Sequence, residues 1–387
     1  MVCTGKGKIM ARLGDVCIVV SGSTPNTSIG EYWDGDIKWI TPAELNEDSF
    51  YIMDSVRHIT EQGKNKTGLT YMPVGTVILS SRAPIGKTAI AGCEMCCNQG
   101  FKNLICSERI YNEYLYFFLK AKTDFLNSLG RGATFKELSK SIVENIDIPL
   151  PAYEIQKQIS IQMKQIERLI SLRKQQLLKL DELVKSRFVE LFGDININDK
   201  NWDCQPLGEL CTIVRGGSPR PIENFLGGDV PWIKIGDATK GDNIYLHTTK
   251  EHIIRDGVKK SRMVKSGSLI FANCGVSLGF ARIITFDGCI HDGWLAMEDI
   301  DARLDKVFLL QALNQMTDHF RKIAPAGTQP NLNTAIMKAY AQIIPPMELQ
   351  KEYVAFVEQV DKSKLAIQKS LEKLETLKKA LMQKYFG

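Results

Sequence analysis

The sequence predicts an α+β protein with two tandem, pseudo-symmetric heads joined by two long helices that form an antiparallel coiled coil. Three observations predict this architecture. The chain matches itself at an offset of about 194 residues, both copies show the same order of segments, and each copy ends in a long stretch free of glycine and proline. Such a repeat decides how many structural units a chain contains.

The duplication is visible at ordered positions through both copies. Gly35–Ile40 matches Gly228–Ile233, and Gly75–Leu79 matches Gly267–Phe271. Further matches, in the same order, pair Arg12–Asp15 with Pro206–Glu209, Gly22–Pro25 with Gly216–Pro219, Asn98–Phe101 with His291–Trp294, and Leu191–Gly193 with Tyr385–Gly387. So many matches in one order indicate a duplicated unit rather than a chance similarity.

Each head has the same internal plan. Short strand-like runs such as Val16–Val20, Thr76–Ser80 and Leu269–Ala272 are separated by glycine, proline and asparagine, which favour turns. A helical stretch is predicted over residues 112–129 in the first copy and 305–323 in the second. Proline then stops the preceding structure, at Ile148–Pro151 and at Ile344–Pro346.

The long segments Tyr153–Phe192 and Leu349–Phe386 carry apolar residues at alternating spacings of three and four, interrupted at Arg173. This heptad-like stripe is typical of a coiled-coil seam, and a helix of about 40 residues is about 60 Å long. Heptads alone leave the direction of pairing open, and we infer antiparallel pairing from the duplication. We expect these residues to pack helix against helix: Ile159, Ile166, Leu177, Leu180, Val360, Leu371 and Leu374.

Composition and charge limit the class of protein. Hydrophobic residues make up 44% and charged residues 24%, which is typical of globular chains. The net charge of +5 permits a nucleic-acid partner without requiring one. Apolar runs are too short to span a bilayer, and the N-terminus lacks the apolar stretch of a secretory signal. We therefore expect a soluble, cytoplasmic protein without a membrane partner, whose ten cysteines stay reduced.

Two heads held apart by stiff helices suit the reading of two short patches on double-stranded DNA, whose helical turn is about 34–36 Å. Basic residues in loop-like contexts are the candidates to contact phosphates or base edges. The predicted DNA-binding residues are Arg57, Lys64, Lys66, Arg82, Lys87, Lys102, Arg131, Arg215, Arg220, Lys234, Lys259, Lys260, Arg262 and Arg321. Trp39 and Trp232, at matching places, are expected in the core rather than stacked on bases.

The repeated head resembles the specificity subunit of Type I restriction–modification systems. Three kinds of segment carry the resemblance: the Gly-Asp-x-x-Trp-Ile run, the stretch Gly327–Asn333 before the second hinge, and the Pro-x-x-x-Gln-Lys or Pro-x-x-x-x-Gln-Lys start of each long helix. Leu191–Asp194 fits the same family. The first copy departs from the pattern before its hinge, where residues 132–139 read Gly-Ala-Thr-Phe-Lys-Glu-Leu-Ser.

The resemblance implies target-recognition domains at residues 1–150 and 194–345, and spacer helices at 151–193 and 346–387. It implies that each domain reads one half of an asymmetric, interrupted DNA site and that the helices set the unread spacer. Two modification subunits would dock on the chain and methylate DNA, and through them restriction subunits would join. No cofactor is expected on this chain, since S-adenosylmethionine, ATP and Mg would belong to the partner subunits.

Two segments imitate other sites. Ser81–Thr88 ends like a phosphate-binding loop, but serine stands where that loop needs glycine, and the residues after Thr88 make a poor helix start. Cys93, Cys96, Cys97 and Cys106 have spacings that suggest zinc. The second copy keeps neither pattern, so we expect no nucleotide site and no metal.

Catalytic constellations are not found in the sequence, so we expect a non-catalytic subunit. Only five histidines occur, and His291 matches Asn98 in the repeat, which favours a polar structural role in both copies. One alternative from another class remains open, a coiled-coil scaffold whose heads bind protein partners. Steep salt dependence of duplex binding would distinguish a DNA reader from such a scaffold.

Overall fold

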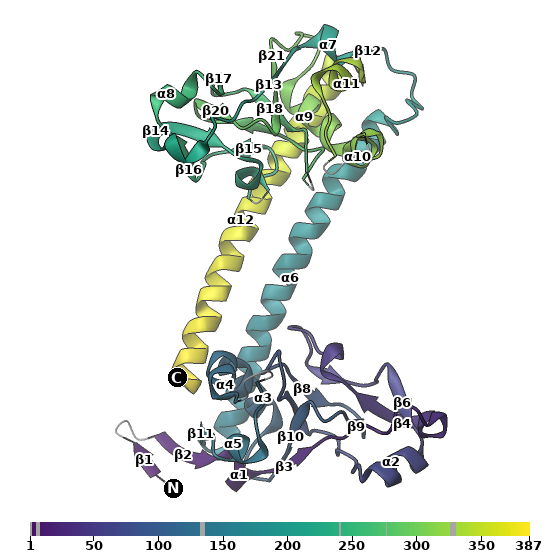
Figure 1. Ribbon diagram of the computed structural model, residues 1–387, viewed down its shortest axis with the longest axis vertical. Coiled ribbons are helices and arrows are strands. Elements are labelled where there is room, and N and C mark those ends of the chain that lie inside the picture. Colours follow the sequence, from purple (N-terminus) through teal and green to yellow (C-terminus); the bar gives the residue numbers. More distant parts are fainter. Residues whose placement is uncertain (1, 5–7, 132–135, 240, 276, 326–329) are drawn as a thin grey trace. The chain divides into compact units, whose positions relative to one another are not determined.

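The computed structural model describes residues 2–4, 8–131, 136–239, 241–275, 277–325 and 330–387 (Figure 1). They form two compact units. Unit 1 consists of Met1–Gln175 and Gln368–Gly387, and unit 2 of Gln176–Ile367. Because each unit contains a head and parts of both long helices, the predicted α+β fold with tandem heads and two long helices is confirmed. The four-part division of the sequence at residues 150, 193 and 345 stays a prediction.

Unit 1 is built around a five-stranded sheet. Its strands lie in the order β3 (Cys17–Ser21), β10 (Phe101–Cys106), β7 (Val77–Ser80), β8 (Thr88–Ala91) and β5 (Tyr51–Ile52). Two three-stranded sheets have the orders β6 (Arg57–Ile59), β4 (Trp33–Ile40), β9 (Cys96–Cys97), and β1 (Val2–Thr4), β2 (Lys8–Arg12), β11 (Asp147–Pro149). The helices of this head are α1 (Leu13–Val16), α2 (Glu61–Thr67), α3 (Asn112–Ala121), α4 (Thr123–Leu129) and α5 (Lys140–Glu144), with 3-10 turns η1 (Gly30–Tyr32) and η2 (Pro42–Glu44).

Unit 2 repeats this plan. Its five-stranded sheet has the order β13 (Thr212–Arg215), β21 (Trp294–Glu298), β18 (Leu269–Ala272), β19 (Ala281–Ile284) and β15 (Tyr245–Leu246). The other sheets are β16 (Glu251–Ile253), β14 (Leu226–Ile233), β20 (Gly288–Ile290), β17 (Arg262–Val264), and β12 (Cys204–Pro206) with β22 (Ala341–Ile343). Its helices are α7 (Leu207–Leu210), α8 (Arg255–Val258), α9 (Lys306–Gln315), α10 (Thr317–Ile323) and α11 (Thr334–Ala339), with 3-10 turns η3 (Ile222–Asn224) and η4 (Ile235–Ala238).

The central strands of each five-stranded sheet are buried on both faces, which explains why they read as continuous apolar runs. Val77 and Leu79 of β7 belong to one hydrophobic cluster with α3, whereas Ile78 belongs to a second cluster on the opposite face. In unit 2 Leu269 packs with α9 and Ile270 joins the cluster on the other face. The alternation of strand side chains therefore divides each head into two apolar layers.

Each predicted helical stretch is in fact two helices. Residues 112–129 form α3 and α4, which meet at Lys122, and residues 305–323 form α9 and α10, which meet at Met316. At each break a threonine hydroxyl donates to a carbonyl three residues earlier, Thr123 to Lys120 at 3.0 Å and Thr317 to Asn314 at 2.8 Å. Such local side-chain bonds compete with the main-chain ladder, and the apolar spacing does not report them.

The two long helices are α6 (Tyr153–Phe192) and α12 (Met347–Phe386). Near the start of each, a fully buried glutamine binds the head in the same way. Gln156 accepts from the Tyr111 amide at 2.9 Å and donates to the carbonyls of Arg109 at 3.0 Å and Pro151 at 2.9 Å. We call this set of bonds the glutamine clamp.

The second copy repeats the glutamine clamp. Gln350 accepts from the Asp305 amide at 2.8 Å and donates to Arg303 O at 2.8 Å and Pro345 O at 2.7 Å. The glutamine of the Gln-Lys pair at the start of each helix therefore has a structural role. It satisfies buried main-chain groups that the proline hinge leaves without a regular partner.

The predicted antiparallel pairing of the long helices is observed within each unit. In unit 1 Tyr385 donates to Gln162 at 2.8 Å and Lys378 pairs with Glu167 at 2.6 Å. The residue numbers of the paired positions decrease along α12 as they increase along α6, so the two helices run antiparallel. In unit 2 Lys364 pairs with Asp181 at 2.6 Å. Of the predicted seam residues, four are buried and three half-buried: Ile159, Ile166, Val360 and Leu371, then Leu177, Leu180 and Leu374.

Replacing Gln156 or Gln350 by leucine is expected to lower the free energy of unfolding by about 1–3 kcal/mol, because buried main-chain groups lose their partners. Gln165, which is exposed on the same helix as Gln156, gives the matched control Gln165→Leu. Urea denaturation followed by circular dichroism measures the effect. Equal midpoints for the clamp and control variants would show that the clamp does not stabilise the helix start.

Candidate nucleic-acid interface

One edge of each five-stranded sheet gathers the loops that carry most candidate residues. In unit 1 β3 ends at Ser21 opposite Lys102, and β7 ends at Ser80 opposite Phe101. The loops after β3 and β7 and the turn before β10 therefore emerge together. In unit 2 the same register pairs Arg215 with Leu295 and Ala272 with Trp294. We call these segments the strand-end loops.

A glycine lets the first strand-end loop approach the turn before the next strand. A Cβ on Gly22 would lie 2.1 Å from the carbonyl oxygen of Asn98, and one on Gly216 would lie 2.1 Å from that of His291. The close approach is held by main-chain bonds of 3.0 Å, from Ser23 N to Cys97 O and from Gly217 N to Ile290 O. Glycine is required at both positions because any side chain would collide with main chain.

Side chains then fasten the turn. The Asn98 carboxamide oxygen accepts from the Gly100 amide, and the His291 Nδ1 accepts from the Gly293 amide at 2.9 Å. His291 thus has the polar structural role expected from its match with Asn98. Because Nδ1 accepts, Nε2 carries the proton of the neutral ring and faces Asp292 Oδ1 at 3.0 Å. Burial lowers the pKa of His291 below its ordinary value, against the opposing effect of Asp292.

Asp292 organises the basic residues of unit 2. It accepts from Ser218 Oγ at 2.8 Å and lies 3.5 Å from Arg220 Nη2, and its carbonyl accepts from Arg215 Nε at 3.0 Å. Burial alone would raise the pKa of Asp292, but the Ser218 bond and the nearby positive charges outweigh it and hold the pKa below its ordinary value. The aspartate is therefore ionised beside two guanidinium groups.

The other predicted residues of unit 2 border the same loops or lie next to them. Lys234 pairs with Glu251, and Arg321 donates to Leu278 O at 3.1 Å. Three further cations flank Ser261, whose hydroxyl donates to Gly217 O at 2.7 Å. These cations are Lys259, Lys260 and Arg262, and all three are exposed. Unit 2 thus brings most of its predicted basic residues to one edge of the sheet.

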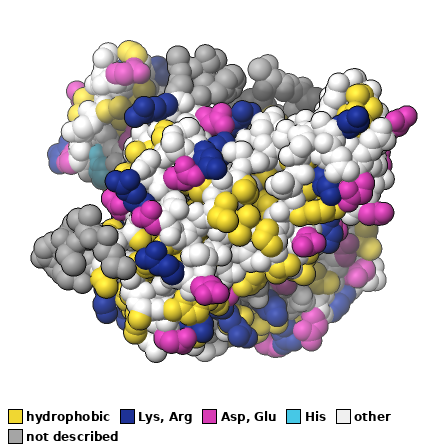
Figure 2. Space-filling view, turned by 90° about the horizontal axis from the view of Figure 1, so that it is seen from below, with side chains coloured by type: hydrophobic (Ala, Val, Ile, Leu, Met, Phe, Trp, Pro, Cys, Tyr) yellow, Lys and Arg dark blue, Asp and Glu magenta, His cyan; other side chains and the backbone are white. Residues whose placement is uncertain are grey.

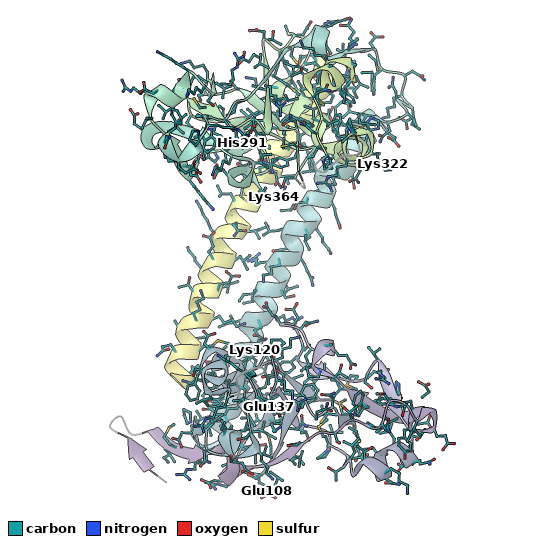
Figure 3. The ribbon with its side chains drawn as sticks, viewed as in Figure 1. Glu108, Lys120, Glu137, His291, Lys322 and Lys364 are labelled. Carbon is teal, nitrogen blue, oxygen red and sulfur yellow. The ribbon has the colours of Figure 1, made fainter. Side chains whose placement is uncertain are left out.

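Unit 1 places an ion-paired cluster at the corresponding edge. Glu137 accepts from Arg82 at 3.0 Å and from Lys102 at 3.3 Å, and it forms a main-chain bridge with Arg131. Burial would raise the pKa of Glu137, but the two cations lower it below its ordinary value. Lys87 donates to Pro42 O at 3.2 Å nearby. Figure 3 labels Glu137 in this head and His291 in the other.

Several predicted residues do not have the loop settings expected from sequence. Lys102 is buried within β10, because its ammonium group is bound by Glu137. Arg57 lies in β6 with its guanidinium 3.6 Å from the Trp33 ring centre. Lys64 and Lys66 lie on α2, where Lys64 pairs with Glu61 at 2.7 Å. Polar residues surround these positions in the sequence, and for that reason the sequence predicts loops at these strand and helix segments.

Trp39 and Trp232 are buried, as expected of core residues. The Trp39 indole donates to Ser23 O at 3.0 Å and so supports the first strand-end loop of unit 1. Sequence reasoning missed Asp292 and Glu137 as organisers of the basic clusters. The repeat contained one signal for Asp292: it stands beside the matched turn glycine, at a position where the first copy has the uncharged Gln99.

The segment before each proline hinge is anchored in the same way in both units. Leu138 N donates to Ser81 O at 2.9 Å, and Leu332 N donates to Asn273 O at 2.8 Å. The side chains differ, because Asn273 Nδ2 donates to Asn331 at 3.1 Å where unit 1 has the Glu137 ion pairs. Residues 132–135 and 326–329, which include part of the family-like stretches, lie outside the described residues.

The look-alike segments have ordinary structural settings. Ser81–Thr88 leads into strand β8, so no helix N-terminus follows this loop among the described residues. Cys96 and Cys97 are buried in β9. Within the described residues, no group of three or more histidine, cysteine, aspartate or glutamate side chains is placed to hold a metal.

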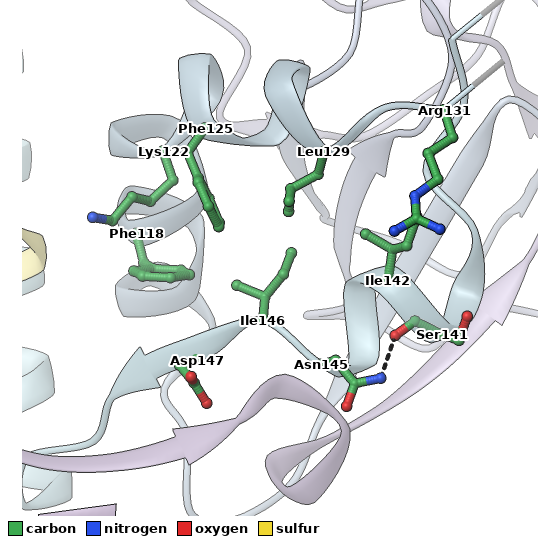
Figure 4. A pocket seen from close by; sticks show the side chains of 10 residues that line it. All are labelled: Phe118, Lys122, Phe125, Leu129, Arg131, Ser141, Ile142, Asn145, Ile146 and Asp147. Carbon is green, nitrogen blue, oxygen red and sulfur yellow. Dashed lines mark hydrogen bonds between the residues drawn. The ribbon is translucent and has the colours of Figure 1, made fainter.

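Unit 1 has a cavity of about 530 Å³ lined by residues of α3, α4, α5 and β11. Figure 4 shows Phe118, Phe125, Leu129 and Ile146 around its centre. Ile146 O accepts from Leu13 N at 2.9 Å, the bond that Tyr340 O forms with Leu207 N in unit 2. There the Tyr340 ring packs 5.0 Å from that of Phe320, whereas unit 1 has an isoleucine at the matching position.

The face seen from below in Figure 2 has mixed character. Lysine and arginine side chains alternate with aspartate and glutamate, and hydrophobic side chains gather near its middle. A field of one sign is typical of surfaces that bind duplex DNA, and the described part of this face does not have one. None of the described helices is long and apolar enough to cross a membrane.

Two segments of the chain match the same protein family. The model of the Type I restriction modification DNA specificity domain matches residues 6–182 and again residues 199–379. The chain belongs to the Type I restriction–modification specificity subunit family. The two matches coincide with the two copies of the repeat.

Relatives of the specificity subunit support this assignment along the whole chain. It is 30% identical to the Type I restriction enzyme MjaIX specificity subunit of Methanocaldococcus jannaschii, covering 96% of this chain and 91% of the relative. It is 22% identical to the MjaVIII specificity subunit of the same organism, covering 96% and 90%.

Solved structures share the fold. One chain, from a structure described as "Structural basis underlying complex assembly and conformational transition of the type I R-M system", has a TM-score of 0.68 at 19% identity and covers 100% of this chain and 99% of its own. The Type I restriction–modification S subunit from M. genitalium has a TM-score of 0.58 at 15% identity and covers 100% and 98%.

Adding a Cβ at Gly22 or Gly216 of the specificity subunit is expected to lower the free energy of unfolding by about 1–3 kcal/mol, since the loop must shift away from main chain. Gly30 and Gly236 have open space where a Cβ would stand and serve as matched controls. Thermal unfolding of Gly22→Ala, Gly216→Ala, Gly30→Ala and Gly236→Ala measures the difference. Equal stability of all four variants would contradict the close approach.

Proposed function

We propose that this chain is the non-catalytic DNA sequence-specificity subunit of a Type I restriction–modification complex and that each head reads one half of a bipartite, asymmetric site. One observation carries the proposal. The two heads hold their strand-end loops with the same main-chain bonds but present different side chains from them. A repeated scaffold with divergent loops suits two readers of two different sequences.

The chemistry of the loops supports a nucleic-acid partner. In unit 2 Arg220 and Arg255 have side chains that are 80% and 85% exposed, and only the first belongs to a strand-end loop. Guanidinium groups on loops bind phosphate oxygens and guanine edges. Phosphate contacts release counterions, so duplex affinity is expected to fall steeply as salt rises. A scaffold that binds protein partners would lack this steep dependence.

The long helices are proposed to set the unread spacer. Each is a continuous helix of 40 residues, about 60 Å long, and each contributes residues to both units. This length is comparable with about one and a half to two turns of duplex DNA. A helix resists bending over that length better than a loop, so it is a suitable ruler.

The outer faces of the helices are proposed to dock the two modification subunits, and through them the restriction subunits. Exposed leucines occur on both helices in both units. In unit 1 they are Leu169, Leu172 and Leu377, and in unit 2 Leu178, Leu183 and Leu365. Apolar side chains exposed on neighbouring helix turns favour a protein partner. S-adenosylmethionine, ATP and Mg would be bound by those partners.

Exchanging residues 1–150 for the first head of another specificity subunit tests the two-reader proposal. The new head is expected to change one half of the methylated sequence and leave the other half intact, because each head reads its own half-site. Modification-sensitive sequencing of DNA methylated by the reconstituted complex gives the readout. Exchange of the second head, residues 194–345, is the reciprocal control. A change in both halves after either exchange would contradict independent reading.

Inserting one heptad in the middle of α6 and one in the middle of α12 tests the ruler. Seven residues add about 10 Å of helix, which corresponds to about three base pairs of spacer. A whole heptad keeps the apolar seam in phase. The same sequencing readout should show the longer spacer with both half-sites unchanged. Seven residues inserted in the loop 194–201 serve as the control, and an unchanged spacer in the helix variant would refute the ruler.

A further inference from the structure

Equivalent positions on or beside the strand-end loops carry different charges in the two units. The loop glycines, the serine or threonine bound to the turn, and the turn glycines are common to both. Among the positions that differ, one set is Ser21, Asn26, Thr41 and Gln99 in unit 1 against Arg215, Arg220, Lys234 and Asp292 in unit 2. The first set is uncharged and every member of the second is charged. Arg82 and Lys102 of unit 1 show the reverse, since they stand against Cys274 and Leu295 of unit 2. Because the main-chain bonds that hold the loops are shared, these side-chain differences point to selectivity rather than to stability.

Within the charged set, Arg220 has the freest guanidinium. Its side chain is 80% exposed, and its ion pair to Asp292 is long, at 3.5 Å. Arg215 differs, because its Nε is already committed to Asp292 O at 3.0 Å. Lys234 is committed to Glu251. Arg220 therefore keeps planar donors available for a ligand while Asp292 restricts where they point.

Asp292 is itself fixed. Ser218 Oγ and His291 Nε2 hold its Oδ1 at 2.8 and 3.0 Å, which leaves Oδ2 toward Arg220. A carboxylate fixed behind an arginine reduces the number of side-chain conformations that the arginine loses on binding. This arrangement makes Asp292 a positioning residue and Arg220 the group that reaches the ligand.

We propose that Arg220, positioned by Asp292, reads a guanine in the half-site of unit 2. The proposal rests on the function proposed above and adds a residue and a base to it. Arginine donates two parallel hydrogen bonds to O6 and N7 of guanine in the major groove, a pattern that no other base offers. The exposed guanidinium on this loop offers a planar fork of donors, which matches two neighbouring acceptors such as O6 and N7.

Unit 1 reads its half-site differently under this proposal. Asn26 stands where unit 2 has Arg220, and its side-chain oxygen accepts from the Ser28 amide at 3.0 Å and from the Ser28 hydroxyl at 2.8 Å. The asparagine is thus used in a local turn. Gln99, at the place of Asp292, is hydrogen-bonded to Thr24. The Arg220 position in unit 1 therefore supplies no guanidinium for a guanine.

The test uses the full chain reconstituted with its modification subunits and maps the methylated motif by modification-sensitive sequencing. The half-site that belongs to unit 2 is identified first by exchange of residues 194–345. It is expected to contain a guanine. Arg220→Ala should reduce the preference for that guanine by about 5- to 150-fold and leave every other position unchanged.

Two further variants distinguish recognition by the two parallel donors of a guanidinium from recognition by positive charge alone. Arg220→Lys keeps the charge but removes the planar pair of donors, so it is expected to relax selectivity at the same guanine nearly as much as alanine does. Arg255→Ala is the matched control, since this exposed arginine lies at the start of α8, outside the strand-end loops, and pairs with Asp229 of β14 at 3.2 Å. It should leave the motif unchanged. If Arg220→Lys kept full selectivity for the guanine, the proposal of two parallel hydrogen bonds from Arg220 would be overturned.

Asp292→Asn tests the positioning role, and its readout is selectivity at the guanine, which would not change if Asp292 were only structural. Selectivity at the same guanine should fall, while the thermal unfolding midpoint stays within the range of the Arg255→Ala control. The double variant with Arg220→Ala should lose no more selectivity than Arg220→Ala alone, because the aspartate acts through the arginine. Additive losses would overturn the positioning role.

Failure of this inference differs from failure of the proposed function. A bipartite methylated motif whose unit 2 half lacks guanine, or whose guanine preference survives Arg220→Ala, overturns the inference and leaves the function standing. The absence of any preferred motif with the reconstituted complex overturns the function itself. A guanine preference lost only in Arg220 and Asp292 variants supports both.

Discussion

The buried glutamine at the start of each long helix is the constraint on which the rest of the structure depends. Gln156 and Gln350 each close three hydrogen bonds between the first turn of a helix, the proline hinge and the head. Since both amides are fully buried, tilting a helix against its own head would leave several polar groups unsatisfied. The heads therefore fix the direction in which their helices leave.

The far end of each helix is fixed by an aromatic residue instead. Phe386 packs 5.3 Å from the Tyr114 ring in unit 1, and Phe192 packs 4.8 Å from the Phe308 ring in unit 2. Each unit thus takes its core from segments distant in the chain. Neither head completes its apolar cluster from its own copy alone, since Phe386 joins the cluster of unit 1 and Phe192 that of unit 2.

Sequence reasoning predicted the features that repeat or have a period. The duplication, the proline hinges and the long helices follow from repeats and spacing, the antiparallel pairing is inferred from the duplication, and each is observed. The break at Lys122 could not be predicted, because it depends on one threonine hydroxyl bonding to a local carbonyl. The burial of Lys102 depends on Glu137, thirty-five residues away, and long-range pairing of this kind leaves no local pattern.

The division of labour between main chain and side chain explains how one scaffold carries two selectivities. The bonds that hold the strand-end loops, such as Leu138 N to Ser81 O and Leu332 N to Asn273 O, join main-chain atoms and, apart from Gly22 and Gly216, place few demands on residue type. Side chains beside them are then free to differ, as the ion pair of Arg82 and the amide pair of Asn273 do. A duplicated chain can therefore change what one head reads without unfolding either head.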